Sequence, residues 1–314
     1  MKIHTFIYEI LQKMQEEMGE NVKISLQDIT KNNGVVLTGL TFVQKNVNIS
    51  PTIYLEDFYE DYKEGKSMDN IMDEIKEIYY KSRMDQDINM NFFTEYEQAK
   101  ERIVYKLINY DKNRELLKEI PHREYLDLAI VYYYLVDMKE FSNATILIHN
   151  KHMKAWEINE EELYLRAKEN TSQLLGMNFC GMMEVLKELT GEDFWCGNLN
   201  ESEEHKEKSF LLESHAGRDE TGMYVLSNGS RLYGAATILY ENVMEYCAER
   251  VGGSFFILPS SVHEVILVPD EGQVTREKLR QMVREVNATQ VEEQEQLSDF
   301  VYYYSAENGR IVRL

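Results

Sequence analysis

The sequence has few residues of the kinds that interrupt a chain or cross-link it. Four prolines among 314 residues leave little basis for long linkers. The three cysteines, Cys180, Cys196 and Cys247, are odd in number and far apart, so they suggest neither a disulfide framework nor a zinc site. Reduced thiols in a cytoplasmic protein are the simplest expectation.

Positive charge is also scarce, because the formal net charge is −21. A protein that binds nucleic-acid backbone needs Lys and Arg to displace phosphate counterions, and anionic membranes attract basic segments. We therefore expect neither partner. No apolar run is long enough to span a membrane, and the N-terminal MKIHTFIYEILQKMQEEMGE mixes apolar with charged residues, which predicts a helix of the mature protein.

Motifs that hold cofactors or metals are missing. No phosphate-binding G-x-x-x-x-G-K-[ST] occurs, Gly252-Gly253 lacks the third glycine of a dinucleotide site, and no G-x-S-x-G is present. His263-Glu264 lacks the second histidine of a zinc-protease motif. A metal site at His149 and His152 would need both imidazoles on one face plus further ligands, and the segment is predicted to lie at a strand end, so these are expected to be surface or strand-end histidines. We expect no cofactor and no metal.

The most hydrophobic stretch is Ser254–Pro269, SFFILPSSVHEVILVP, within a chain that is 43% hydrophobic. Two apolar runs separated by Pro259-Ser260-Ser261 predict two buried strands joined by a short connection. Ser260, Ser261, His263 and Glu264 are polar residues embedded in this stretch, and buried polar groups need partners.

This polar cluster is therefore the first candidate for a functional site. A serine here would need a base within hydrogen-bond reach, and His263 is close enough in sequence to serve. The alternative is an ordinary turn whose hydroxyls bond their own backbone. His122, which follows Pro121, is a more remote candidate for a general base.

Hairpin signals dominate the predicted secondary structure. Asn-Gly pairs at Asn33-Gly34 and Asn308-Gly309 separate apolar runs, as in β-hairpins. Helical spacing predicts helices at about 94–109 and 232–251, and the β-branched, aromatic run Tyr125–Val136 predicts a buried strand.

Antiparallel hairpins that outnumber βαβ units predict an α+β fold, with mostly antiparallel sheets and helices packed on one face. We expect two subdomains: an N-terminal α+β region at 1–190 and a C-terminal β-α-β-β-α-β-β region at 222–314. The acidic stretch 191–221 between them is predicted to be a mobile connection.

Several long strings resemble a known family. NISPTIYLEDFYEDYKEG, RIVYKLINYDKNRELLKEIPHREYLDLAIVYYYLV, HMKAWEINEEELYLRAKENT and GGSFFILPSSVHEVILVPDEG are similar to domain of unknown function 5688, a family of gut Firmicutes. More distantly, W-x-I-x-E-x-x-L followed by A-x-x-N, together with strand-Pro-Ser-x-x-H-x-V-x-L, looks like the YtpQ-type bacterial family. The resemblance implies one family-level unit in a bacterial cytoplasmic protein and supplies no catalytic residues.

No catalytic signature remains after this search, so the sequence favours a protein-binding or regulatory module without catalysis of its own. Two alternatives stay open. One is an enzyme, such as a hydrolase, with a dispersed site near His263. The other is an acidic decoy that imitates DNA or docks a basic partner.

Overall fold

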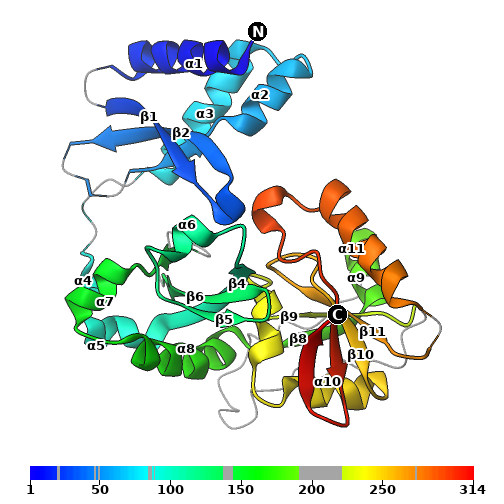
Figure 1. The fold of residues 1–314 in the computed structure, drawn as a ribbon. Coiled ribbons are helices and arrows are strands. Elements are labelled where there is room, and N and C mark those ends of the chain that lie inside the picture. The colour runs from blue at the N-terminus through cyan, green and yellow to red at the C-terminus, as the bar shows by residue number, and fades with distance from the viewer. Residues whose placement is uncertain are drawn as a thin grey trace. The chain divides into compact units, whose positions relative to one another are not determined.

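The computed structural model of the chain describes residues 1–19, 22–45, 47–48, 50–83, 87, 89–136, 144–190, 221–272 and 274–314 (Figure 1). These residues form two compact units, Met1–Met90 and Asn91–Leu314. Strands pair in antiparallel fashion in each of the three sheets, and helices pack against them, so the fold is α+β as predicted. No helix in these ranges is long and apolar enough to cross a membrane.

The N-terminal unit packs three helices with one small sheet. Its helices are α1 (Ile3–Met18), α2 (Glu56–Lys63) and α3 (Met68–Ser82), and its strands, in the order β1-β2-β3, are β1 (Val22–Thr30), β2 (Val36–Gln44) and β3 (Thr52–Tyr54). Phe6, Ile10 and Met14 recur at helical spacing on α1 and are fully buried. They share a core with Ile71 and Ile75 of α3.

The first predicted hairpin is confirmed, and its turn has the expected backbone. β1 and β2 pair from Val22↔Gln44 to Thr30↔Val36. Asn33 and Gly34 between them have φ angles of 60° and 73°. Asn and Gly tolerate this left-handed region better than other residues, which is why the pair marks turns of this kind.

The C-terminal unit contains two sheets. The first has the order β4-β6-β5, with β7 also paired to β6, and consists of β4 (Ile103–Asn109), β5 (His122–Tyr125), β6 (Leu128–Leu135) and β7 (Thr145–Leu147). Short helices surround it: α4 (Asn91–Thr94), α5 (Tyr96–Ala99), η2 (Lys100–Arg102), α6 (Arg114–Leu117) and α7 (Asn150–Trp156). The longer α8 (Glu160–Leu175) contacts β4.

The second sheet is six-stranded, with the order β13-β12-β10-β11-β9-β8. Its strands are β8 (Asn178–Gly181), β9 (Tyr224–Ser227), β10 (Phe255–Leu258), β11 (Val265–Pro269), β12 (Tyr302–Ser305) and β13 (Arg310–Arg313). The remaining helices are α9 (Met182–Thr190), η3 (Gly234–Leu239), α10 (Val243–Val251), α11 (Arg276–Thr289) and η4 (Glu293–Glu295).

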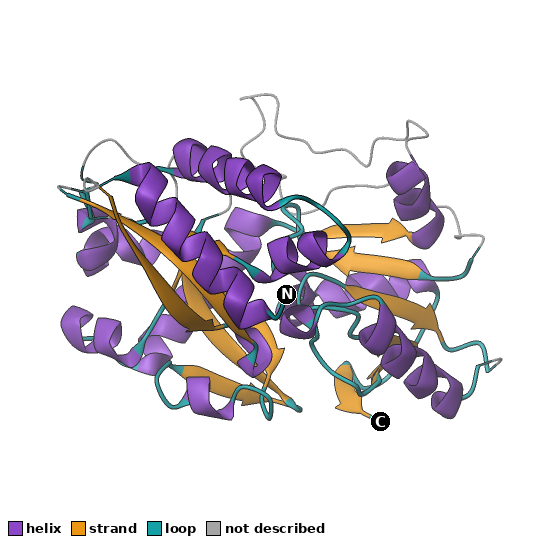
Figure 2. Cartoon of the chain, turned by 90° about the horizontal axis from the view of Figure 1, so that it is seen from above, coloured by secondary structure: helices purple, strands orange, loops and turns teal. Residues whose placement is uncertain are grey.

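Helices lie along the strands of this sheet on both faces, whereas the sequence places them on one (Figure 2). Phe256 and Leu258 of β10 share a core with Leu279 and Val283 of α11. On the opposite face, Phe179 of β8 contacts Tyr246 of α10 edge to face. The predicted Ser254–Pro269 hairpin lies in the middle of the sheet, paired from Phe255↔Pro269 to Leu258↔Ile266.

Two predicted helices are wrong. The stretch 94–109 ends in strand β4, because Ile103–Asn109 is rich in β-branched residues and pairs with β6 along its whole length. The stretch 232–251 is broken between η3 and α10, where Asn242 has a φ of 60°. A left-handed residue cannot continue a right-handed helix, so α10 begins only after Asn242.

The predicted connection 191–221 lies outside the described residues apart from Thr221. β8 before it pairs with β9 after it, from Asn178↔Ser227 to Gly181↔Tyr224, so one sheet draws strands from both sides of that stretch. The division between Met90 and Asn91 was not predicted.

Candidate functional site

The residues of the polar cluster predicted in the β10–β11 connection lie close together, and the hydrogen bonds between them are those of a local turn. The Ser261 hydroxyl donates to Glu264 Oε1 at 3.1 Å and accepts the backbone N–H of His263 at 3.0 Å. The backbone N–H of Ser260 donates to Leu258 O. The proton of Ser261 is therefore directed to Glu264 and not to the imidazole of His263.

Both nitrogens of the His263 ring face other segments of the C-terminal unit. Nδ1 lies 3.3 Å from the Tyr233 backbone nitrogen and 3.2 Å from Arg231 O. Nε2 lies 3.4 Å from Glu295 Oε1. In the tautomer protonated at Nε2, Nδ1 accepts the Tyr233 N–H, and in the tautomer protonated at Nδ1 it donates to Arg231 O. His263 thus links the connection to two neighbouring loops.

The loop before η3, residues 228–234, has an unusual backbone. Arg231 and Tyr233 have φ angles of 53° and 57°. A bulky residue in this left-handed region is a conformational outlier that persists only when surrounding contacts enforce it, and such outliers concentrate at functional sites.

Contacts inside the loop enforce this conformation. Asn228 is buried; its Nδ2 donates to Leu232 O at 2.8 Å, and its Oδ1 accepts the Leu232 N–H at 3.2 Å. A β-carbon on Gly234 would lie 2.1 Å from Ser227 Oγ and 2.5 Å from His263 O. Only glycine allows the loop to approach the β10–β11 connection this closely.

The ring of Tyr233 lies between the imidazole of His263 and the ammonium group of Lys106. The Tyr233 ring stacks on the His263 imidazole, with centroids 5.6 Å apart and planes 14° apart. The Lys106 ammonium of β4 lies 3.8 Å from the centroid of the Tyr233 ring, and Tyr133 of β6 meets that ring edge-on. We call these four residues, Lys106, Tyr133, Tyr233 and His263, the Lys106–Tyr233 platform.

Two polar groups of the platform are uncommitted. Lys106 makes cation–π contacts with Tyr233 and Tyr133 and, among the residues that the structure describes, no ion pair or hydrogen bond. The Tyr133 hydroxyl is buried and has no hydrogen-bond partner in the same part of the chain. A buried hydroxyl without a partner costs free energy, so each such group calls for an explanation.

Tyrosines around the platform are held in their neutral form. Burial raises the pKa of Tyr133, and also the pKa values of Tyr105 and Tyr240 beside it. These hydroxyls can donate or accept hydrogen bonds but cannot act as phenolate bases near neutral pH. The platform is therefore suited to binding and supplies no evident catalytic base from its tyrosines.

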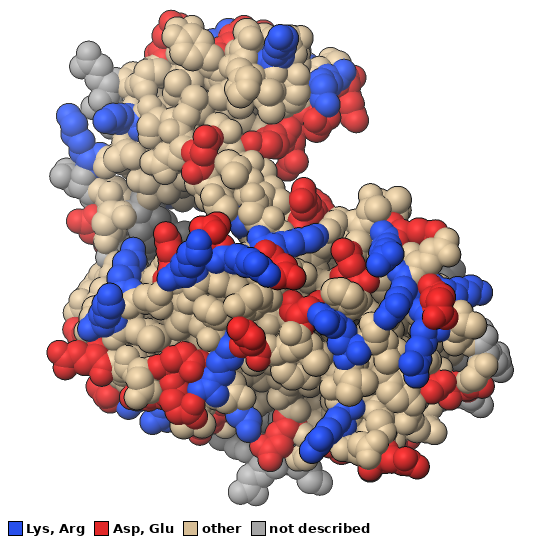
Figure 3. Space-filling model, viewed as in Figure 1, with Lys and Arg blue, Asp and Glu red and all other residues tan. Residues whose placement is uncertain are grey.

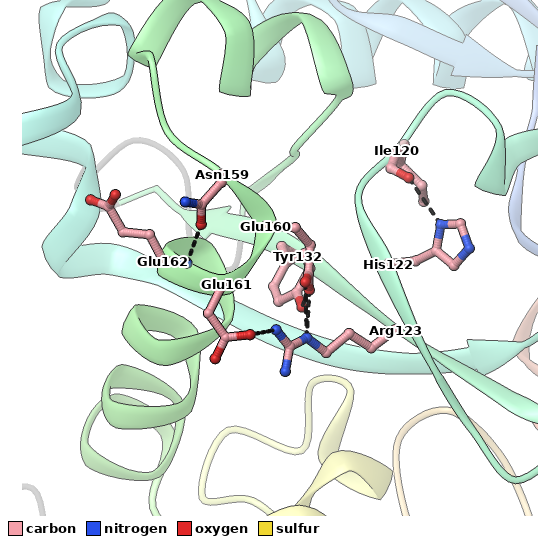
Figure 4. A network of polar contacts seen from close by, with 8 residues as sticks. All are labelled: Ile120, His122, Arg123, Tyr132, Asn159, Glu160, Glu161 and Glu162. Atoms are coloured by element: carbon pink, nitrogen blue, oxygen red, sulfur yellow. Dashed lines mark hydrogen bonds and ion pairs between the residues drawn. The ribbon is translucent and has the colours of Figure 1, made fainter.

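His122 lies apart from this site. Its Nδ1 is 3.1 Å from Ile120 O, and its ring meets Tyr110 edge-on. Figure 4 shows its side chain pointing away from that of Arg123, its neighbour on β5, as alternation along a strand requires.

Arg123 belongs to a network at the start of α8 (Figure 4). Its Nε donates to Glu160 at 2.7 Å, its Nη2 pairs with Glu161, and the Tyr132 hydroxyl also donates to Glu160. Hydrogen bonding to Glu160 raises the pKa of Arg123, and burial raises the pKa of Tyr132. Because every one of these charges is paired, the network anchors α8 to the sheet and leaves no charge free for a ligand.

No group of three or more His, Cys, Asp or Glu among the described residues is placed to hold a metal ion. His149 and His152 instead form a turn at the start of α7, where the His149 N–H donates to His152 Nδ1 at 3.0 Å. Burial lowers the pKa of both imidazoles.

A comparison with protein families shows which family the chain belongs to. The sequence model of a family of unknown function, DUF5688, matches residues 3–306. The chain belongs to that family. The suspected family is thereby confirmed, and its members share no assigned activity. Neither a curated protein nor a solved structure matches the chain.

Sequence reasoning located the β10–β11 connection in this DUF5688 chain but missed Lys106, Tyr133 and Tyr233. Lys106 stood within a predicted helix, so its position beside Tyr133 on the neighbouring strand was hidden. A signal was available: Lys106 is the one charged residue inside the strand sequence IVYKLIN. A lysine flanked by buried residues of a strand has to be reached by solvent or by a partner.

Proposed function

We propose that this chain is a binding protein without catalysis of its own, and that it recognises an acidic group of a protein partner at the Lys106–Tyr233 platform. The observation that carries the proposal is the Lys106 ammonium, held over the Tyr233 ring at 3.8 Å without an anion among the described residues. A preformed cation that still lacks its counterion favours a carboxylate ligand, because charge-assisted hydrogen bonds are stronger than neutral ones.

The platform's construction also supports binding. The left-handed backbone of Tyr233 and the close approach at Gly234 fix the ring in one position before any partner arrives. A surface that is already ordered loses less conformational entropy when it binds. The half-buried Lys106 keeps access to solvent, so an incoming carboxylate can reach it.

The hydrolase alternative has less support. The Ser261 proton is directed to Glu264, and the His263 nitrogens face Tyr233, Arg231 and Glu295. A nucleophile and its base have to be within hydrogen-bond reach of one another, and this pair is instead engaged in separate bonds.

The decoy alternative requires carboxylates in rows that imitate phosphates. On the face drawn in Figure 3, Lys and Arg are interleaved with Asp and Glu over the C-terminal unit. That mixed surface favours a partner recognised by local contacts. In our proposal the chain works in the bacterial cytoplasm, where the buried thiol of Cys247 would stay reduced.

Affinity capture from a lysate of the organism that makes the chain tests this function. Lys106→Met keeps the aliphatic stem on the Tyr233 ring and removes the charge, so we expect partner retention to fall at least tenfold, as for the loss of a bond to a charged group worth about 1.5–3 kcal/mol. Lys168→Met is the matched control, because Lys168 is an exposed lysine of α8. Equal retention by wild type and Lys106→Met would contradict the proposal, as would the absence of any stoichiometric partner.

Tyr133→Phe tests the role of the Tyr133 hydroxyl in the same experiment. If the hydroxyl contributes to the bound state, the variant weakens partner retention. In the free protein, removal of a buried hydroxyl that lacks a partner should leave stability unchanged or raise it, which thermal unfolding measures. Reduced retention together with undiminished stability would separate a binding role from simple misfolding.

A further inference from the structure

Among the strands that the structure describes, β13 is the last at one edge of the six-stranded sheet, and it ends at the C label in Figures 1 and 2. It pairs with β12 from Tyr302↔Arg313 to Ser305↔Arg310. The Leu314 N–H donates to Val301 O, so in an antiparallel ladder the residues whose backbone groups point to β12 are Arg310 and Val312. Ile311 and Arg313 therefore turn their N–H and C=O groups outward.

The side chains around this edge combine positive charge with apolar surface. Arg310 and Arg313 are exposed, and neither has an ion pair among the described residues. Val312 and Phe300 are 47% and 38% exposed. The Arg313 guanidinium lies 4.6 Å from the centroid of the Phe300 ring, which positions it beside the strand.

Proteins limit pairing at exposed edge strands with short strand length, proline, bulges, covering helices or charged side chains. β13 is four residues long, contains no proline, and carries the exposed Arg310 and Arg313. Its positive charge discourages pairing with basic strands but does not oppose an acidic one. A second copy of β13 would bring four arginines into one short ladder, whereas an acidic strand would neutralise them.

We infer that β13 accepts an extended acidic segment of a partner protein as a seventh strand. Main-chain bonds from Ile311 and Arg313 supply affinity, and the two arginines select the sequence. Arg310 and Arg313 are three residues apart and lie on opposite faces of the strand. The fitting segment therefore has acidic residues at positions i and i+3, with β-branched residues between them.

This inference is independent of the Lys106–Tyr233 platform. Lys106→Met should leave binding at β13 unchanged, and this result keeps failure of one proposal distinct from failure of the other.

The test is a titration of the full chain with the peptide acetyl-Thr-Thr-Glu-Val-Thr-Glu-Thr-Thr-amide, followed by NMR. We expect saturable shifts at the amides of Ile311 and Arg313 and slower hydrogen exchange at both. The same peptide with Gln in place of Glu should bind at least tenfold more weakly, and so should the original peptide to the variant Arg310→Gln/Arg313→Gln. These two arginines are exposed, so the variant should keep the wild-type melting temperature.

Three outcomes would overturn the inference. The first is the absence of saturable binding by the acidic peptide. The second is equal affinity for the Glu and Gln peptides, which would remove the role of the arginines. The third is a concentration-dependent dimer in sedimentation that Arg310→Gln/Arg313→Gln strengthens and the peptide does not displace, because β13 would then pair with a second copy.

Discussion

Tyr233 is a residue whose observed backbone conformation disagrees with its local preference. A tyrosine with a φ of 57° gives up free energy relative to an extended or helical backbone, typically about 1–3 kcal/mol. The surrounding bonds from Asn228, His263 and Ser227 compensate for this cost. Because these bonds hold the strained backbone in place, we infer that the strain serves to position the Tyr233 ring.

Gly234 provides a direct test of this close packing. Gly234→Ala would place a β-carbon 2.5 Å from His263 O and 2.6 Å from the Asn228 nitrogen, and backbone atoms cannot rotate away. We expect a loss of about 3 kcal/mol of unfolding free energy, the upper part of the range for overpacking, measured by denaturant titration.

Gly272→Ala is the control for this measurement. Gly272, unlike Gly234, has a left-handed backbone with a φ of 72°, and no atom of the described residues lies within 4 Å of its added β-carbon. It should lose only about 1 kcal/mol, through the left-handed backbone alone. If the two variants were equally stable, the loop would have room that the observed contacts do not allow.

At the scale of elements, α8 does more than cover a hydrophobic surface, because it closes the open edge of β4. Asn170 Nδ2 donates to Lys100 O and Ile103 O at 2.8 and 2.9 Å. Thr171 Oγ1 accepts the Tyr105 N–H at 3.0 Å. Both side chains are buried, so the helix satisfies backbone groups that an exposed edge would leave to water.

Thr171→Val is therefore expected to cost more than its small change in shape suggests. The variant keeps the volume but leaves the buried N–H of Tyr105 without an acceptor, which should cost about 1–3 kcal/mol of unfolding free energy. Hydrogen exchange at Tyr105 should also become faster. Gln173→Ala, on the exposed side of the same helix, should change stability by less than about 0.5 kcal/mol, and a similar effect in both variants would contradict the edge role.

How well the sequence predicted each element depended on how local the determining contacts are. The hairpins at Asn33-Gly34 and Asn308-Gly309 follow from short turns, and both were predicted. β4 was missed because its state is decided by pairing with β6, more than a dozen residues away, and helical spacing competed in the same stretch. The Lys106–Tyr233 platform joins residues of four segments, so the single charge in IVYKLIN could mark Lys106 but not the side chains that it meets.

At the scale of the whole molecule, the boundary between the two compact units is not marked by a change in amino-acid composition. The two units meet between Met90 and Asn91, without the Pro- or Gly-rich linker that usually marks a boundary. The decisive feature is burial: α1 and α3 complete a core with β1–β3 in the N-terminal unit. Separate cores imply that each unit supplies its own stability.

Separate cores should produce two unfolding steps in the full chain. Ile10 is fully buried in the N-terminal unit and Leu267 in the C-terminal unit, so Ile10→Ala and Leu267→Ala should each remove about 2–5 kcal/mol from the unit that contains the residue. In denaturant titrations followed by residue-resolved NMR, each variant should shift the transition of its own unit alone. Leu165→Ala, at a leucine that is 55% exposed, should shift neither by more than about 0.5 kcal/mol. The contrary result would be that Ile10→Ala shifts the unfolding transition of the region around Leu267 as much as that of its own unit. In that case the two units would unfold as one cooperative structure although each has its own core.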